Sequence, residues 1–136
     1  MSQQAVLKNR QVSTDAAFHT ILVRRYTWQM DTIAVLTTID SLDRAQAMAE
    51  ALVKRKLAAC VQISSIESVY RWQGETRREP EYRLMVKTVK KRYADVEAAI
   101  RELHTYDLPA IYAFEMTDAF APYAEWVADN SSGEKS

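Results

Sequence analysis

The sequence predicts an α+β fold of the ferredoxin-like type, in which a βαββαβ chain forms an antiparallel sheet with helices on one face. Three observations predict it. Two β-prone arms, residues 57–72 and 81–88, flank a polar tip around Gly74 and indicate a long central hairpin. A strand and then a helical pattern precede this hairpin. A helical pattern and then a strand follow it, and an extra C-terminal helix ends the domain.

The first half of the pattern begins with residues 32–38 (TIAVLTT), a β-branched run typical of a strand. Asp40 or Ser41 can cap the next helix, because a short polar side chain accepts from free backbone N–H groups. The helix is expected over residues 41–56. Its apolar positions recur at helical spacing and are expected to face the core: Leu42, Ala45, Met48, Ala49, Leu52 and Val53.

The hairpin arms alternate apolar and polar residues, so each arm can place one face on a core. Val61 and Ile63 share a face of the first arm, and Leu84 and Val86 share a face of the second. Both arms look longer than the strands expected at either end of the domain. Their ends should therefore overhang the sheet and leave unpaired edges, which are a liability unless they are covered. Pairing with a neighbouring subunit would cover these strand edges, so we expect a closed homo-oligomer.

After the hairpin, residues 93–103 form a second amphipathic pattern, and Pro109 prevents any helix from continuing. Residues 110–116 predict the fourth strand, and residues 121–129 predict the final helix. Residues 131–136 form a polar tail that is expected to fray. The side chains expected to line one side of each helix are Val96, Ile100 and Leu103, then Tyr123, Trp126 and Val127.

Length and composition fit one globular domain, which we place at residues 30–130 of the 136-residue chain. Residues 1–29 lack a periodic apolar pattern, and they are expected to be an N-terminal extension outside the core, with Met30 as the natural start. A transit peptide is the alternative. Zero net charge gives no reason to expect a nucleic-acid partner, and the absence of a long apolar run argues against a membrane span. The single Cys60 fits a reducing compartment, so a cytoplasmic location is expected.

Few residues offer chemistry. His104, Tyr106 and Asp107 cluster where the second helix ends, and His104 could act as a base, as a metal ligand or only as a cap. Cys60 is interpreted as a small structural residue. The sequence shows no Ser/His/Asp order and no glycine-rich loop, so we expect no enzymatic activity.

Glu79 and Glu81, at the start of the second arm, are spaced two apart and would share a face on a regular strand. Paired carboxylates can do acid–base work or bind hard cations, or they can simply pair with nearby arginines. Pro80 between them indicates a bulge or an edge position. Trp72 and Trp126 could line a pocket, a subunit contact or the core. Two basic clusters are interpreted as solvated surface: Arg77-Arg78 and Lys90-Lys91-Arg92.

Five motifs in register carry a family resemblance: LAACVQI (57–63), SVYRWQG (68–74), EPEYRLMVKT (79–88), HTYDLP (104–109) and YAEW (123–126). Together they closely resemble CutA, the divalent-cation tolerance family, over about residues 31–130. The resemblance implies a homotrimer in which long hairpins pair between subunits. It implies no required cofactor, but copper(II) or another divalent cation as a ligand, with His104 as the metal contact.

The resemblance also implies a cleft between subunits, formed by Trp72, Glu79, Glu81, Lys87, Tyr106 and Trp126, with Pro109 and Tyr123 in its framework. Three positions depart from the family pattern. Thr37 stands where some members have a cysteine, Leu103 where some have a second histidine, and Ala110 where a glutamate often follows the proline.

Two hypotheses follow. In the first, the protein binds or responds to a divalent metal through His104 and carboxylates. In the second, it is a trimeric small-molecule sensor or scaffold that resembles nitrogen-regulatory signal proteins, with its ligand in the cleft between subunits. The three departures favour the second hypothesis. An enzyme is a third class, for which the sequence offers no catalytic constellation.

Overall fold

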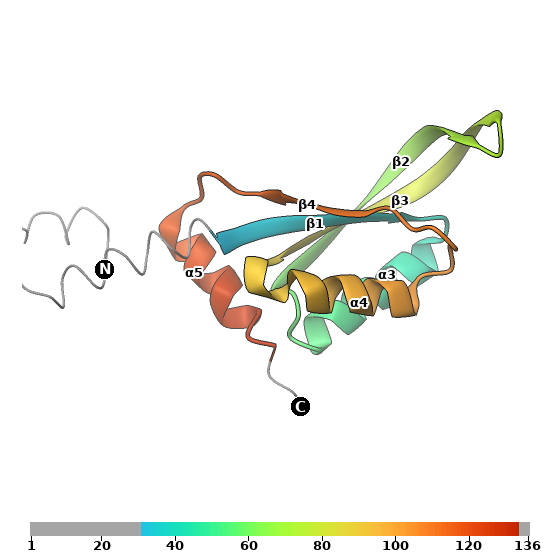
Figure 1. Cartoon of the computed structure of the whole chain (residues 1–136). Coiled ribbons are helices and arrows are strands. Elements are labelled where there is room, and N and C mark those ends of the chain that lie inside the picture. Colours follow the sequence, from blue (N-terminus) through green and yellow to red (C-terminus); the bar gives the residue numbers. More distant parts are fainter. Residues whose placement is uncertain (1–30, 134–136) are drawn as a thin grey trace, which may run out of the picture.

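The computed structural model describes residues 31–133, which form a four-stranded antiparallel sheet with helices on one face (Figure 1). The predicted ferredoxin-like fold is confirmed, with strand order β2-β3-β1-β4. The predicted extension at residues 1–29 lies outside the described residues. The elements are β1 (Thr32–Ile39), α3 (Leu42–Lys54), β2 (Cys60–Trp72), β3 (Glu75–Val89), the 3₁₀ turn Lys90–Arg92, α4 (Tyr93–Leu103), β4 (Ile111–Glu115) and α5 (Ala121–Asn130).

Strand β1 is one of the two interior strands of the sheet and pairs antiparallel with β3 on one side and β4 on the other. Its β-branched and apolar sequence suits a strand that is buried on both faces. Val35 and Ile39 are fully buried on the helix side, and Leu36 is only 5% exposed on the opposite side. The pairs run from Thr32–Val89 to Ile39–Tyr82, so β1 ends level with Tyr82.

Helix α3 begins as predicted, because the Ser41 hydroxyl accepts a hydrogen bond from the Arg44 backbone N–H at 3.3 Å. Its buried stripe is narrower than the apolar pattern suggests. Ala45, Met48 and Leu52 are buried, whereas Leu42 and Val53 are each 42% exposed, so their predicted inward orientation is wrong. These two residues lie in the first and last turns of the helix, at the edges of the stripe that contacts the sheet.

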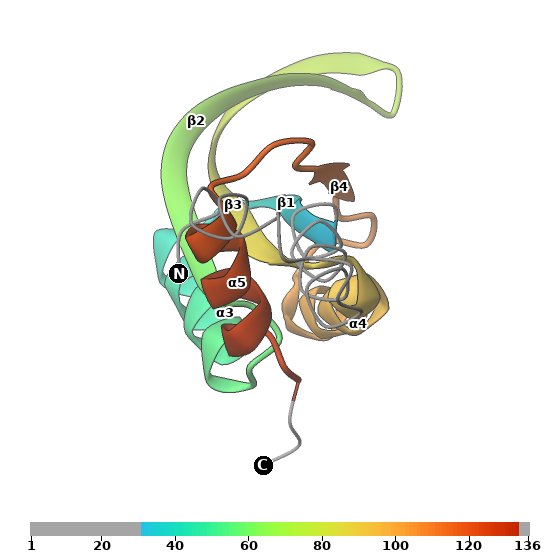
Figure 2. The same cartoon turned by 90° about the vertical axis from the view of Figure 1, so that its left-hand side faces the viewer.

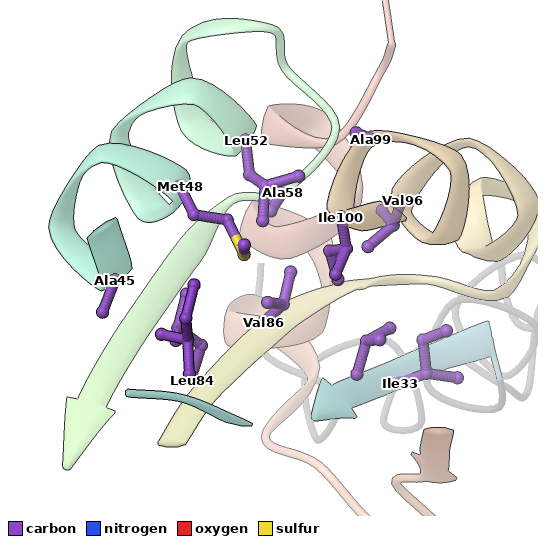
Figure 3. Close-up of a cluster of buried hydrophobic side chains, with 12 residues drawn as sticks. Ile33, Ala45, Met48, Leu52, Ala58, Leu84, Val86, Val96, Ala99 and Ile100 are labelled. Carbon is purple, nitrogen blue, oxygen red and sulfur yellow. The ribbon is translucent and has the colours of Figure 1, made fainter. Parts of the chain in front are cut away.

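The core lies between the sheet and helices α3 and α4 (Figure 3). Val96 and Ile100 of α4 are fully buried there, as their spacing predicts, and Leu103 is partly buried. From the sheet, Leu84 and Val86 point into the same cluster and are fully buried. One layer of helices therefore covers one face of the sheet.

Strands β2 and β3 form one continuous ladder from Cys60–Lys87 to Trp72–Glu75. A two-residue turn, Gln73-Gly74, joins them, and both residues have positive φ values of 51° and 79°, which matches the twist that tight hairpins prefer. The predicted polar connector is therefore too long, because residues 75–80 are strand. Beyond Tyr82 the hairpin has no β1 partner, which confirms the predicted overhang (residues 66–81). It arches over the sheet face opposite α3 and α4 (Figure 2).

Residues 131–133, which follow α5, are anchored, although the sequence predicts a frayed tail over residues 131–136. Ser131 is fully buried, and the Gly133 N–H donates to the Lys56 carbonyl at 2.8 Å. Arg92, expected at the solvated surface, instead donates from Nε to the Ser131 carbonyl at 3.2 Å and from Nη2 to the Ser132 carbonyl. Residues 131–133 are therefore tied to the start of α4 and to the loop after α3.

Candidate functional site

A pocket of about 700 Å³ lies beneath the overhang. The hairpin supplies one wall, the end of β1 supplies a second, and the loop between α4 and β4 supplies a third. Four of the six residues predicted for the cleft line this pocket: Trp72, Glu79, Glu81 and Tyr106. Directly opposite residues of a ladder share a face of the sheet. Tyr70 lies opposite Arg77, and Trp72 lies opposite Glu75. Most of the side chains of the hairpin that line the pocket therefore come from one face of both strands.

Two tyrosine–glutamate pairs face the pocket. The Tyr106 hydroxyl donates to Glu81 Oε2 at 2.7 Å, and the Tyr70 hydroxyl donates to Glu79 Oε2 at 3.0 Å. Glu81 is only 7% exposed, whereas Tyr70 is 37% exposed. The predicted shared face of Glu79 and Glu81 is confirmed, and their strand runs without a bulge, since Pro80 pairs in register with Glu67 at the free edge.

The two pairs differ in what raises the pKa of the tyrosine hydroxyl. Burial, and then the hydrogen bond to Glu81, raise the pKa of Tyr106 well above its ordinary value of 10.0. The hydrogen bond to Glu79 is the main cause that raises the pKa of Tyr70, which is otherwise solvated. Both hydroxyls therefore keep their protons at neutral pH and act as donors to carboxylates.

The charges of the pocket are unbalanced. Its lining holds four acids, Asp40, Glu79, Glu81 and Asp107, and one base, Arg77. Within the described part of the chain, no basic nitrogen lies within 4.0 Å of the Glu81 carboxylate. Arg77 was expected at the solvated surface, but its Nε is buried and has no hydrogen-bond partner among residues 31–133. Within residues 31–133, this region thus holds a buried acid without a counter-charge and a buried donor without an acceptor.

His104 is the C-cap of α4, and both of its ring nitrogens are occupied. Its Nδ1 accepts from the Tyr106 N–H at 3.1 Å, so Nε2 carries the proton and donates to the Thr38 carbonyl at 2.8 Å. A metal ion could reach this imidazole only if one of these hydrogen bonds broke. The geometry favours the capping and packing role over the ligand role.

The described residues of one chain do not provide a complete set of metal ligands. Among the described residues, no three His, Cys, Asp or Glu side chains lie close enough to hold an ion. Cys60 is half-buried at the first residue of β2, and the Thr37 hydroxyl is buried and has no partner in the part of the chain described. Glu79 and Glu81 can supply oxygen ligands that suit hard cations, but further ligands must come from elsewhere.

The two remaining predicted cleft residues lie outside this pocket. Lys87 Nζ stands 5.5 Å from the centroid of the Tyr123 ring, and Tyr123 stacks on Trp126 with centroids 5.9 Å apart. This second cluster belongs to α5 and the opposite end of β3. A single chain therefore divides the predicted set, and a shared cleft across subunits stays a prediction.

The lining residues that the sequence interpretation did not place in the cleft include Asp40, Tyr70 and Arg77. Tyr70 and Arg77 alternate in phase with Trp72 and Glu79 along their strands, so the two-residue period could have identified them. Asp40 was considered only as a helix cap, and its place near Tyr106 depends on tertiary contacts.

The chain matches known proteins over this same region. The family model for "CutA1 divalent ion tolerance protein" matches residues 33–130. A "Divalent-cation tolerance protein CutA" from Thermus thermophilus is 37% identical over 98 residues, which are 71% of this chain and 95% of the relative. A "Protein CutA homolog" from Xenopus laevis is 30% identical over 123 residues, which cover 85% of this chain and 82% of the relative.

The solved structures agree. CutA from Synechococcus elongatus superposes with a TM-score of 0.73 at 32% identity and covers 75% of this chain and 91% of that one. The compartment differs among relatives, since one from Arabidopsis thaliana is named chloroplastic and one from Archaeoglobus fulgidus is described as periplasmic. In residues 31–133, no helix is long and apolar enough to cross a membrane. By its family model, its relatives and its fold, this chain belongs to the CutA1 divalent ion tolerance protein family.

Proposed function

We propose that the protein is a non-catalytic, cytoplasmic homotrimer that serves divalent-cation tolerance by binding a divalent cation where subunits meet. The observation that carries this proposal is the buried Glu81 carboxylate, which faces a pocket without a cation partner in the described chain. A buried charge requires a counter-charge or a metal, and a divalent cation supplies one. Copper(II) is the ion that the family resemblance suggests.

The free strand edges support an assembly. Among the described strands β4 pairs with β1 alone, and the overhang carries β3 past the end of β1. Large apolar side chains are exposed beside these edges, with Trp72 at 40%, Tyr112 at 45% and Phe114 at 62%. A neighbouring subunit that pairs with these edges would cover both the backbone groups and the rings. The family resemblance implies that this assembly is a closed ring of three subunits.

A neighbouring subunit could also supply the metal ligands that one chain lacks. Glu79 and Glu81 provide carboxylate oxygens from one subunit, and a partner lying over the pocket would add the remaining ligands. Oxygen donors suit magnesium, calcium and manganese better than they suit copper(I). The occupied ring of His104 supports the carboxylates, rather than the imidazole, as the ligands in one chain.

The test is calorimetric titration of manganese(II), copper(II) and zinc(II) into metal-free protein, with the mass fixed by light scattering. We expect stoichiometric binding to a trimer, abolished in Glu81→Gln and retained in His104→Ala. The matched control is Glu67→Gln, an exposed glutamate on the same hairpin that pairs with Arg78. Binding that disappears only in His104→Ala would transfer the site to the imidazole, and a monomeric mass would overturn the assembly.

A second candidate is a small-molecule sensor or scaffold with its ligand in the same pocket. The pocket volume favours it, because 700 Å³ lies within the range of small-molecule sites and far exceeds one ion. Thermal-shift screening distinguishes the two functions, since a ligand that binds only the folded state raises the melting temperature. Stabilisation by metals alone would exclude the sensor.

A further inference from the structure

We infer that the pocket beneath the overhang binds a small organic ammonium compound that carries a hydrogen-bond acceptor at its other end. This inference rests on the same pocket as the proposed function and names a second class of ligand for it. Three features carry it: the buried Glu81 carboxylate, which has no counter-charge in the described chain, the aromatic walls, and Arg77 as the one basic residue of the described lining.

The carboxylates select the charge of the ligand. Glu81 is only 7% exposed, and within residues 31–133 its carboxylate accepts a hydrogen bond from the neutral hydroxyl of Tyr106. Glu79 likewise accepts from the neutral hydroxyl of Tyr70. A phenol cannot balance a carboxylate's charge, so an arriving cation would gain a charge-assisted hydrogen bond in a site already partly shielded from water.

The walls select an organic cation. Trp72, Tyr70 and Tyr106 all line the pocket, and Val69 and Leu108 add apolar surface. Aromatic faces attract ammonium groups through the ring quadrupole and also cover alkyl carbons. A bare divalent ion uses carboxylate oxygens but gains nothing from the apolar surface. An alkylammonium ion gains from both kinds of wall.

Arg77 defines the other end of the ligand. It is the one basic residue among the described residues that line the pocket, and its guanidinium carries several N–H donors for an acceptor on the ligand. On β3, Arg77, Glu79 and Glu81 occupy alternate positions of one face. Their ends are four residues apart, about 13 Å between Cα atoms at the rise of an extended strand. A flexible chain of about six carbons with an ammonium group and a hydroxyl suits this layout.

The experiment compares three six-carbon probes by calorimetry and by NMR titration of the full-length protein: hexylammonium, 1-hexanol and 6-amino-1-hexanol. We expect hexylammonium to bind at least tenfold more tightly than hexanol, because only the cation can pair with Glu81. We expect 6-amino-1-hexanol to bind a few-fold more tightly than hexylammonium, because its hydroxyl can accept from Arg77.

Two pairs of variants locate the contacts. Glu81→Gln keeps the side-chain shape and should remove the preference for the cation, whereas Glu67→Gln should leave it unchanged. Arg77→Met should remove the advantage of the hydroxyl, whereas Arg78→Met, one residue further along the hairpin and outside the pocket lining, should preserve it.

Equal affinity for hexanol and hexylammonium would overturn the inference, as would full cation preference in a folded Glu81→Gln protein. If that variant does not fold, the comparison of probes on the wild-type protein remains decisive. Manganese(II) titration of the same sample separates this inference from the proposed function. Metal binding without ammonium binding overturns the inference alone, and ammonium binding without metal binding supports it while overturning the metal proposal.

Discussion

The two halves of the hairpin follow different rules although one hydrogen-bonded ladder runs through both. In the half beside β1, Leu84 and Val86 are fully buried under the helices. In the overhang, Val69 is 58% exposed and most residues of β3 are charged. The first half is held by packing, whereas the second is held mainly by its own ladder and by its continuity with the first. The half beside β1 therefore contributes most to the stability of the fold, whereas the overhang contributes the hairpin wall of the pocket.

The largest expected effect comes from equivalent truncations in the two halves. Leu84→Ala should lower the free energy of unfolding by about 2–5 kcal/mol, because it leaves a cavity in the core. Val69→Ala removes an exposed side chain and should change it by less than about 0.5 kcal/mol. Urea denaturation at a fixed protein concentration measures both. Similar losses would show that the overhang is packed as tightly as the core.

A change in the overhang should instead affect assembly. Trp72→Ala is expected to weaken the association of subunits by about 2 kcal/mol or more, as loss of an aromatic anchor does. Light scattering across a dilution series measures it. Leu42→Ala, which removes a comparably exposed apolar side chain from α3, should leave assembly unchanged. An undiminished oligomer in Trp72→Ala would contradict the placement of Trp72 at a subunit contact.

The tyrosine–glutamate pairs sharpen the comparison within the pocket. Tyr106→Phe leaves the buried Glu81 without a donor, so it should cost about 1–3 kcal/mol in the free energy of unfolding. Tyr70→Phe removes an equivalent bond at an exposed pair, and its denaturation midpoint should match the wild type. Calorimetric melting at neutral pH compares them. A greater loss in Tyr70→Phe would reverse our assignment of the buried pair.

The raised pKa of Tyr106 gives a dependence on alkaline pH. Since folding holds this proton more tightly, its contribution to stability is complete below the unfolded pKa of about 10 and is lost as the pH rises above it. The wild type should therefore lose stability above about pH 10 more steeply than Tyr106→Phe. Denaturation curves across this range test the difference, and parallel slopes would contradict it.

The smallest expected effect lies at Thr37 of β1, which pairs with the core half of the hairpin. Its buried hydroxyl has no partner among residues 31–133, so Thr37→Val should raise the free energy of unfolding by about 1 kcal/mol. The matched control is Thr88→Val, which loses a 2.7 Å hydrogen bond to the Leu57 carbonyl and should be destabilised. Destabilisation of both variants in urea would show that Thr37 has a partner.

The fold was predictable wherever one face of an element is buried. The second helix was placed at residues 93–103, where α4 lies, because a buried stripe produces a clear helical period. The two-residue turn at Gln73-Gly74 was missed for the opposite reason. Residues 75–80 are polar on both faces of the overhang, so their sequence resembles a loop although the ladder with β2 makes them strand.

The candidate site was predictable only in part. The family resemblance indicated Trp72, Glu79, Glu81 and Tyr106, which line one pocket. The pairing of Tyr106 with Glu81 joins residues 25 positions apart, and the contact of His104 with Thr38 spans 66 positions. No local pattern encodes such contacts. The oligomeric state, the metal and the compartment stay predictions, since they depend on partners outside one chain.

The position of β1 has a consequence for synthesis on the ribosome. It is the first strand of the described chain, yet both of its neighbours come later, β3 from Glu75 onward and β4 from Ile111 onward. The most β-prone segment therefore emerges before either partner exists, and its sheet cannot close until almost the whole domain has been made. During that interval β1 is an aggregation hazard, and α3 is the first of the described elements that can form locally and shield it.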